Sequence, residues 1–369
     1  MKKPVRRTVT LKDLSRITHY SINTVSRALR GKDDIAPETV EKIRQTAREM
    51  GYINNALASS LRSGRTNSIA VILGDISNPH FAIMMKEIES RARQDGYSSF
   101  LLNTNENGEQ ERQAIEIALN KNVDGIIICP SQQDESNIRY LMQTNIPFVQ
   151  IGRRFEKLDA GFVICNDELG GYQATRYLLD KGHRDILMLS GPSYVSSARE
   201  RQAGYRRAFK EYGLRVQKKL IREVPVTSEG CAEVFEGILK EGIHFTAIFA
   251  FSDMLAWDAW TCLQRQGFKI PEDYSLIGFD NIQSRFAIPF QLSTISSYKA
   301  KMSTTAVACL LCIIRGEQHS HEECGGLCRH VIDTELVEGE TVRALPMNFT
   351  FTEEICHERH EQTRTDREI

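Results

Sequence analysis

The chain has 369 residues, 41% hydrophobic and 26% charged, a composition typical of globular proteins that predicts two or three domains. No apolar run is long enough to span a membrane and the basic N-terminus lacks the apolar core of a secretory signal, so we expect a cytoplasmic protein with no membrane partner. Residues 1–65 carry fourteen Lys/Arg and six Asp/Glu, a net charge of +8, whereas the remainder carries −9, so nucleic acid is an expected partner of the N-terminal segment alone.

Three short helices are predicted in this basic segment. Thr10 and Ser21 are typical N-cap residues, and Leu11, Leu14 and Ile17 follow Thr10 at helical spacing, which predicts the first helix. A tight turn between the first two helices indicates a helix-turn-helix, whose second helix enters the major groove of DNA. The expected helices cover residues 11–18, 22–30 and 38–50.

From residue 68 onward, short β-branched segments alternate with amphipathic ones. This alternation predicts parallel sheets covered by helices, and its repetition after residue 168 predicts two similar lobes. Ligands of such folds bind at the carboxyl ends of the strands, so the cleft between the lobes is the expected pocket. The expected strands lie within 68–76, 97–103, 123–130, 146–153, 162–167, 186–192, 220–226, 246–251 and 274–280.

Several motifs resemble, in the same order, the LacI/GalR family of bacterial transcription regulators, and the resemblance extends to about Val342. They include VTLKDLSRIT, SINTVSRALRG, DISNPHFA, KGHRDILMLSGP and SLIGFDN. The resemblance implies an α+β multidomain fold, with an N-terminal all-α helix-turn-helix head and two doubly wound α/β lobes of periplasmic-binding-protein type. It also implies a ligand-responsive regulator, more often a repressor than an activator, that binds a near-palindromic operator in double-stranded DNA as a homodimer. The implied effector is a small polar molecule, a sugar or sugar derivative, and the implied location is the bacterial cytoplasm, at the nucleoid when DNA is bound.

The expected domains follow from this resemblance. Residues 1–53 form the DNA-binding domain, 54–66 the hinge helix and linker, 67–345 the effector-binding and dimerisation body, and 346–369 a disordered tail. The tail has no leucine heptad for a tetramerising coiled coil, which favours a dimer over a tetramer. Within the body, lobe 1 is expected at 67–164 and 296–328, and lobe 2 at 165–294 and 329–345.

The expected DNA contacts centre on the second helix. Asn23 is suited to bidentate bonding with adenine and Ile22 to contact with a thymine methyl group, because both lie at the N-terminal end that faces base edges. Arg27, one turn along, is expected to pair with guanine or phosphate. The remaining expected contacts are Thr10, Ser21, Thr24 and Ser26, mainly to phosphate, and the hinge residues Asn55 and Leu61, for which the resemblance implies that Leu61 inserts into the minor groove.

Candidate effector contacts follow the ends of the predicted strands. The resemblance marks Arg201 and Asp280 as the family's most regular contacts, whereas Asn78 is equally suited to capping a helix, and His183 is interpreted as part of a structural turn. No aromatic platform is obvious near Pro225, which weakens the assignment of a specific sugar. The expected effector residues are Asp75, His80, Phe81, Arg153, Arg201, Ser252, Asp253 and Asp280.

A cysteine-rich segment near the C-terminus loosely matches the spacing of zinc ligands. Two of its cysteines, Cys309 and Cys312, lie in an apolar helix, where the same spacing is suited to core packing. We interpret the nine cysteines of the chain as reduced thiols and expect no metal and no cofactor. The segment comprises Cys309, Cys312, His319, His321, Cys324 and Cys328.

Two other classes of protein share parts of these patterns. A solute-binding sensor without a DNA role would have the same body, but the absent signal sequence and the basic head argue against it. An enzyme is disfavoured because the sequence has no P-loop, no G-x-G-x-x-G motif after a strand, no G-x-S-x-G motif and no metal triad.

Overall fold

The structure, a computed structural model, describes residues 9–31, 34–53, 64–225, 228–285, 290–316 and 328–346. It divides into two compact units, Met1–Thr66 and Asn67–Ile369, called here the head and the body. Among the described helices, none combines the length and the apolar character needed to cross a bilayer. Several residues of the sequence predictions lie outside the described ranges, namely Asn55, Leu61, His319, His321, Cys324 and the tail from residue 347.

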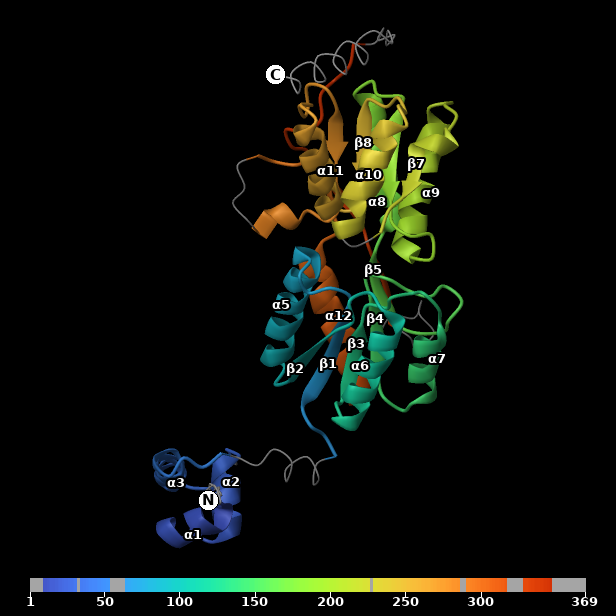
Figure 1. The fold of residues 1–369 in the computed structure, drawn as a ribbon. Coiled ribbons are helices and arrows are strands. Elements are labelled where there is room, and N and C mark those ends of the chain that lie inside the picture. Colours follow the sequence, from blue (N-terminus) through green and yellow to red (C-terminus); the bar gives the residue numbers. More distant parts are fainter. Residues whose placement is uncertain are drawn as a thin grey trace, which may run out of the picture. The chain divides into compact units, whose positions relative to one another are not determined.

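The head consists of three helices around a small apolar core (Figure 1). The hydroxyl of Thr10 and the carboxylate of Asp13 cap the first helix reciprocally, and Ser21 caps the second, as the N-cap pattern predicts. The helices are α1 (Leu11–Thr18), α2 (Ile22–Leu29) and α3 (Pro37–Glu49). Their buried apolar residues are Leu14, Val25, Ala28, Ile43 and Ala47.

The turn between α1 and α2 is tight because His19 adopts the left-handed conformation, with φ of 59°. Not every apolar residue at helical spacing faces the core, because the Ile17 side chain is 49% exposed. Leu14 and Thr18, one turn apart, occupy the buried face of this eight-residue helix, and the Thr18 hydroxyl donates to the Leu14 carbonyl. Ile17 lies to one side of that face.

The first lobe of the body is a six-stranded parallel sheet with the strand order β11-β5-β4-β3-β1-β2. Its inner strands are buried and mostly apolar because helices cover both faces: α5 and α12 pack on one and α6 and α7 on the other. The elements are β1 (Ser68–Leu73), α5 (Pro79–Gln94), β2 (Ser98–Asn103), α6 (Gly108–Asn120), β3 (Gly125–Ile128), α7 (Ser136–Gln143), β4 (Phe148–Ile151), β5 (Phe162–Cys165), α12 (Lys299–Arg315) and β11 (Arg329–Ile332).

The second lobe repeats this design with a four-stranded parallel sheet in the order β7-β6-β8-β9. Helices α8 and α9 pack on one face and α10 and α11 on the other. A short antiparallel pair, β10 with β12, completes the lobe. The elements are α8 (Asp167–Asp180), β6 (Ile186–Ser190), α9 (Ser196–Glu211), η1 (Lys218–Leu220), β7 (Ile221–Glu223), α10 (Ser228–Lys240), β8 (Ala247–Ala250), α11 (Asp253–Arg265), β9 (Ser275–Ile277), η2 (Ile282–Arg285), β10 (Thr294–Ser296) and β12 (Glu335–Val337).

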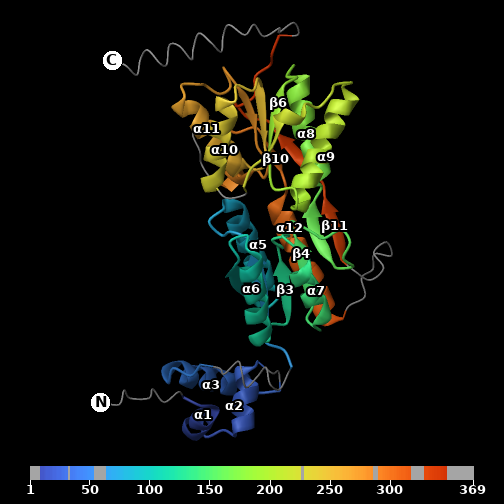
Figure 2. The ribbon, with the colours of Figure 1, turned by 45° about the vertical axis from the view of Figure 1, so that its right-hand side comes forward.

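Two segments near the C-terminal end of the sequence belong to the first lobe. Helix α12 and strand β11 lie there beside elements from the first half of the sequence (Figures 1 and 2). The prediction that residues 329–345 all belong to lobe 2 is wrong for β11, which pairs in parallel with β5 from Arg329 to Ile332. Only β12 joins the second lobe, so the chain crosses between the lobes after β11 rather than before it. A strand of four residues is compatible with pairing in either sheet, and its sequence alone does not decide between them.

Helices α8 and α9 cross so closely that each requires a glycine at the contact (Figure 2). A β-carbon on Gly171 would lie 2.2 Å from the Arg201 carbonyl oxygen, and one on Gly204 would lie 2.1 Å from the Glu168 carbonyl oxygen. Both obstacles are backbone atoms, which a rotamer change cannot remove. The crossing therefore fixes where α9 places its side chains relative to α8.

We predict that Gly204→Ala lowers the free energy of unfolding of the body by about 1–3 kcal/mol or more, because the added methyl group forces two backbones apart. Gly237→Ala is the matched control, since Gly237 lies in α10 with open space around it, and alanine there should be neutral or stabilising by up to about 1 kcal/mol. Chemical denaturation of both variants measures the effect, and equal stabilities would contradict the close crossing.

Candidate DNA interface and ligand pocket

The N-terminal end of α2 exposes an apolar side chain beside an amide. Ile22 is 48% exposed and Asn23 is exposed as well, while Val25 and Ala28 on the opposite face are fully buried in the head. The Ser21 hydroxyl accepts from the backbone N–H of Thr24 at 3.1 Å, which fixes the start of the helix. The free surface of α2 therefore offers both an apolar contact and a bidentate amide, the two groups expected to read base edges.

Two of the predicted DNA contacts have charged partners on other parts of the head, in addition to the capping bonds of Thr10, Ser21 and Thr24. Arg27 forms an ion pair with Asp34, and the Ser26 hydroxyl accepts from Arg30 at 2.6 Å. Both side chains of the Arg27 pair are substantially exposed, and such pairs contribute only about 0–1 kcal/mol. Phosphate can therefore replace Asp34 at little cost. Neither Asp34 nor Arg30 could be identified as a partner from the sequence, because these contacts form only in the folded head.

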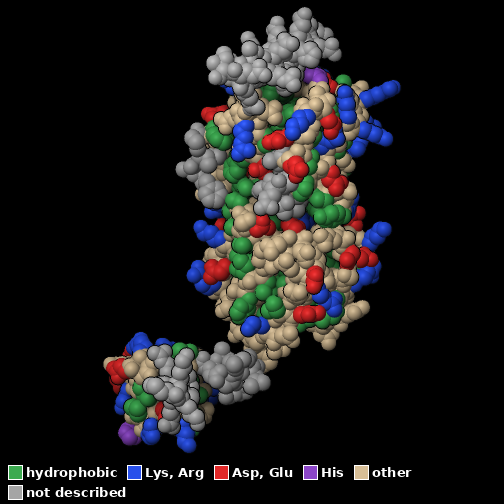
Figure 3. All heavy atoms as spheres, in the orientation of Figure 1, with side chains coloured by type: hydrophobic (Ala, Val, Ile, Leu, Met, Phe, Trp, Pro, Cys, Tyr) green, Lys and Arg blue, Asp and Glu red, His purple; other side chains and the backbone are tan. Residues whose placement is uncertain are grey.

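The body has a mixed surface. Figure 3 shows basic and acidic side chains interspersed over both lobes on the visible face. With a net charge of −9 outside residues 1–65, the body as a whole is a poor partner for a polyanion. The arrangement agrees with DNA binding by the head alone.

The body contains a cavity of about 360 Å³ between the lobes. It is lined by residues from the carboxyl ends of strands in both sheets, as expected for doubly wound folds. Seven of the eight predicted effector residues line it: Asp75, His80, Phe81, Arg153, Arg201, Ser252 and Asp280. The other lining residues are Ser77, Asn78, Asn105, Glu106, Cys129, Gly152, Cys165, Ser197, Phe251, Met254, Leu255 and Met302.

The side chain of Arg201 is only 6% exposed, and several partners hold it in place. Its Nε donates to Asp167 Oδ1 at 2.7 Å, and its Nη1 donates to the carbonyl of Phe251. The guanidinium also lies over the rings of Phe279 and Phe251, 3.5 and 4.4 Å from their centroids. Its Nη2 lies 3.9 Å from Asp280 Oδ1, so the two predicted key residues are neighbours in the pocket wall.

Asp280 belongs to the second lobe but contacts residues of the first. Its Oδ1 lies 3.3 Å from His80 Nδ1 at the start of α5, and its backbone carbonyl accepts from the Lys299 ammonium on α12. Burial acts to raise the pKa of the Asp280 carboxyl, but His80, Arg201 and Lys299 outweigh it, and the pKa lies below its usual value. Asp280 is therefore an anion that both lobes contact.

The side of the cavity formed by the first lobe contains a second guanidinium whose charge is balanced by a carboxylate. Arg153 donates to both oxygens of Glu106, at 2.6 and 3.1 Å, and also to the Pro130 carbonyl at 3.3 Å. Gly74 at the end of β1 makes room for this pair, since a β-carbon there would lie 2.2 Å from Glu106 Oε1. The bidentate geometry holds Arg153 in place at the cavity wall.

The loop after β1 is organised by short polar side chains. The Asn78 side chain accepts from the His80 backbone N–H at 2.9 Å and so caps α5, while Asp75 accepts from the backbone and hydroxyl of Ser77. Asn78 and Asp75 also line the cavity. The cap is thus part of the pocket wall, and it positions His80 and Phe81 on the first turn of α5.

Asp253 is the one predicted effector residue that does not line the cavity, and its side chain is fully buried. Its Oδ1 accepts from the Thr294 hydroxyl at 2.5 Å, and its Oδ2 accepts from the backbone N–H of Ile282 at 2.8 Å. Burial raises the pKa of the Asp253 carboxyl to about 7. Asp253 joins β10 and η2 to the start of α11 and so supports the loop that carries Asp280.

Some site residues were missed by the sequence analysis. Asn105 and Glu106 follow β2, so the strand-end rule that selected Asp75 would also have selected them. Asp167 follows β5 and compensates Arg201, whereas Lys299 follows no strand of either parallel sheet, and only the three-dimensional structure brings it to Asp280. His183 is structural, as interpreted: its ring bonds the Thr246 hydroxyl and the Arg343 carbonyl, and burial lowers its pKa to about 4.

Comparison with known proteins covers both units of the chain. The family described as periplasmic binding proteins and sugar binding domain of the LacI family matches residues 66–322, and the family of bacterial regulatory proteins, lacI family, matches residues 10–55. The HTH-type transcriptional repressor PurR of Glaesserella parasuis serovar 5 (strain SH0165) is 32% identical over 341 residues, or 91% of this chain and 99% of the relative. The ribose operon repressor of Haemophilus influenzae (strain ATCC 51907 / DSM 11121 / KW20 / Rd) is 31% identical over 314 residues, or 85% and 94%. A structure of the Lac repressor bound to ONPG in the repressed state superposes with a TM-score of 0.79 at 25% identity, covering 91% of this chain and 100% of that one.

We predict that Asp253→Asn changes how the stability of the body depends on pH. Because the pKa of Asp253 is raised to about 7, the folded body keeps a proton between about pH 4 and pH 7 that the unfolded chain has released. The stabilisation that the protonated Asp253 carboxyl gives to the folded body is thus fully present below about pH 4 and is lost as the pH rises to about 7. The free energy of unfolding of the parent relative to Asp253→Asn should fall across that window and then level off. Denaturant titrations at several pH values measure it, and a difference that is constant with pH would contradict the assignment.

Proposed function

This chain belongs to the LacI family of bacterial regulatory proteins and is a ligand-responsive, DNA-binding transcription regulator, and we propose that it is a repressor controlled by a neutral, hydroxyl-rich effector such as a sugar or sugar derivative. In this proposal the protein acts in the bacterial cytoplasm as a homodimer on a near-palindromic operator. The effector binds in the cavity between the lobes and changes the affinity of the heads for DNA. The proposal assigns no catalytic role to the cavity.

The class of effector is inferred from the two arginines in the cavity wall, because the positive charge of each is balanced by a carboxylate. Arg153 is paired with Glu106 and Arg201 with Asp167, so neither guanidinium has an uncompensated charge to offer to a phosphate or carboxylate. Asp75 and Asp280 add acceptors rather than further positive charge. A ligand with many hydroxyl groups suits this wall, because each hydroxyl both donates and accepts.

The cavity also has an apolar side. Phe81 comes from the first lobe, and Leu255 and Met254 come from the second. A sugar ring has C–H groups on its faces, and these pack against aromatic and aliphatic side chains while its hydroxyl groups bond at the rim. The family match to a sugar binding domain supports the same class of ligand.

We propose that the head reads DNA through α2. Ile22 and Asn23 contact base edges, Arg27 contacts guanine or phosphate after leaving Asp34, and Thr24 and Ser26 contact phosphate. The exposed Ile22 supports this assignment, because an apolar side chain at the open end of a helix has no partner within the described head. The Ile22 side chain is 48% exposed.

The homodimer is supported by an apolar edge on the first lobe. Strand β2 is an edge of the six-stranded sheet, and two of its large apolar side chains, Phe100 and Leu101, are exposed by 44% and 38%. Ile117 on the neighbouring helix α6 is also exposed. Exposed apolar residues on a sheet edge are typical of interaction surfaces, and a two-fold dimer would present two heads to a palindromic operator.

The proposed switch acts through contacts that join the lobes. Besides His80 and Lys299 at Asp280, the lobes are joined by an ion pair of Arg285 with Glu87 at 2.8 Å and another of Arg154 with Glu200 at 3.2 Å. An effector that bonds both walls of the cavity favours one arrangement of these pairs over another. Only such a difference in affinity between two states can shift the equilibrium.

We predict that replacing Ile22 and Asn23 with alanine changes which operator is preferred more than it changes non-specific affinity, because base contacts carry the sequence information. The control is Lys12→Ala in α1, which removes a positive charge from the head outside α2 and should lower affinity for all sequences alike while flattening the salt dependence. Fluorescence anisotropy against selected and random duplexes measures both. Equal losses on every duplex for the Ile22/Asn23 variant would exclude these residues from base readout.

A second prediction concerns the effector. Arg201→Lys keeps a positive charge beside Asp167 but loses the planar fork that also bonds the Phe251 carbonyl and faces Asp280, so effector affinity should fall by about 2–4 kcal/mol. Arg207→Lys on the same helix α9 is the matched control, because Arg207 is exposed and does not line the cavity. A carbohydrate panel screened for operator release identifies the effector, and calorimetry then compares the variants.

Operator affinity without effector should be the same in both variants, since neither residue belongs to the head. If Arg201→Lys binds the identified effector as tightly as the parent does, the effector binds elsewhere. If the protein binds no duplex specifically, a solute-binding sensor without a DNA role replaces the repressor.

A further inference from the structure

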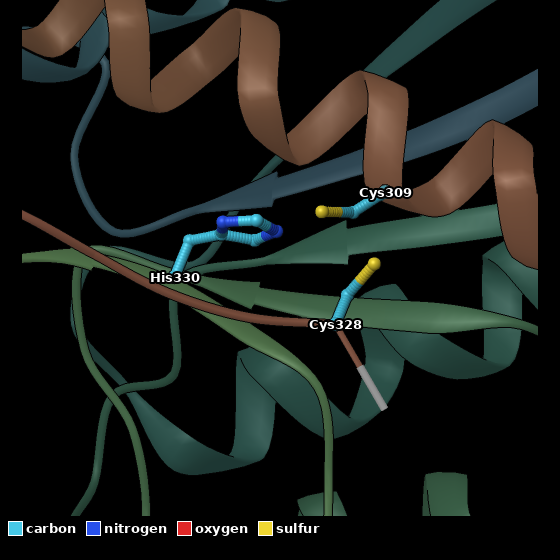
Figure 4. A group of neighbouring side chains, drawn as sticks. All are labelled: Cys309, Cys328 and His330. Atoms are coloured by element: carbon cyan, nitrogen blue, oxygen red, sulfur yellow. The ribbon is translucent and has the colours of Figure 1, made fainter. Parts of the chain in front are cut away.

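Three side chains with metal-ligating atoms meet in the first lobe, away from the residues that line the effector cavity. They are Cys309 on α12, Cys328 immediately before β11, and His330 within β11. Their ligand atoms all lie within 4.8 Å of one another, and Figure 4 shows the side chains directed into one space between the helix and the strand. No other group of this kind is found among the described residues.

The backbone explains why these residues converge. Cys328 and His330 are two positions apart in an extended segment, so their side chains lie on the same face of the sheet. Helix α12 covers that face, and Cys309 lies in the same apolar cluster as Cys328. The segment is anchored on its other side, because the Cys328 carbonyl accepts from the backbone N–H of Phe162 in β5 at 2.8 Å.

We propose that Cys309, Cys328 and His330 form a binding site for a thiophilic metal ion of the zinc class. Two sulfur donors and one imidazole are a common zinc donor set, and they leave one tetrahedral position for water or another ligand. Sulfur donors favour zinc, cobalt and similar ions over magnesium or calcium. Two thiolates on one zinc ion lie about 3.8 Å apart, since each bond is about 2.3 Å long, so small side-chain rotations suffice to close the site.

The position of the group on the sheet suits a bound ion. Strand β11 is an edge of the sheet and His330 is partly exposed, which provides access from solvent, while both cysteines are buried and protected. A cysteine binds zinc as the thiolate, so metal binding must displace protons and should strengthen as the pH rises. An ion here would tie α12 to β11 and so stabilise the part of the first lobe that the chain enters last.

The sequence spacing suggested a different set of ligands. Cys312 pairs with Cys309 in the zinc-like pattern, but it does not belong to the group that the structure brings together. His330 does belong to it, although it lies outside that pattern. This difference supplies a matched control, because Cys309 and Cys312 are one turn apart on the same helix.

The test is a titration of the full chain, reduced and stripped with a chelator, with Co²⁺. We expect one ion per chain, with the sulfur-to-cobalt charge-transfer absorption and strong d–d bands of a tetrahedral site, and displacement of cobalt by Zn²⁺. Zn²⁺ should also raise the melting temperature of the body, because it binds only the folded site. Affinity should be lower at acidic pH.

Cys328→Ser and His330→Gln should each weaken zinc binding by more than the roughly 10–100-fold caused by losing an outer-sphere partner. Cys312→Ser and His244→Gln should bind as the parent does. Circular dichroism and operator binding check that each variant is folded, and the partly exposed His330 gives a second readout if Cys328→Ser fails to fold. The proposal is overturned if the cobalt bands are absent, if they survive both ligand replacements in folded protein, if Cys312→Ser removes them equally, or if the cysteines form a disulfide that Zn²⁺ does not prevent.

Discussion

The burial of one guanidinium, that of Arg201, is the constraint around which the second lobe and its side of the cavity are arranged. An unpaired buried charge is very costly, so a partner must reach it. Asp167 does so from the first turn of α8, and the close crossing of α8 and α9 at Gly171 and Gly204 brings the two helices near enough. The rings of Phe251 and Phe279 also pack against the guanidinium. The same packing that builds the lobe thus also fixes a hydrogen-bonding group in the cavity wall.

Asp280 extends this network to the first lobe, where His80 and Lys299 contact it. Buried ion pairs of this kind contribute little net stability, but removing one partner is strongly destabilising. Their value here is specificity, since the network can be completed only when the two lobes are in one arrangement. An effector that bonds Asp280 or its neighbours competes with these contacts or reinforces them, which gives a physical route from the cavity to the relative position of the lobes.

Much of this organisation could be predicted from the sequence, because it depends on local signals. The N-caps Thr10 and Ser21, the alternation of strands and helices, and the polar residues at strand ends each act over a few residues. The strand-end rule correctly selected seven cavity residues but also Asp253, since it gives the position of a residue and not the direction of its side chain, which turns to Thr294 and Ile282. Lys299 could not be predicted in this way, because it reaches Asp280 only after the chain has crossed between the lobes. The strand β11 was assigned to the wrong lobe because a four-residue strand does not show from its sequence which sheet it joins.

The central claim is that the cavity and the DNA-binding surface are coupled, and thermodynamic reciprocity tests it most directly. The affinity for operator is measured with and without saturating effector, and the affinity for effector is measured with and without operator. The account predicts that both ratios are equal and differ from one, by roughly 5–150-fold if the coupling is of the usual size. An effector affinity that is unchanged when operator is bound would contradict the claim.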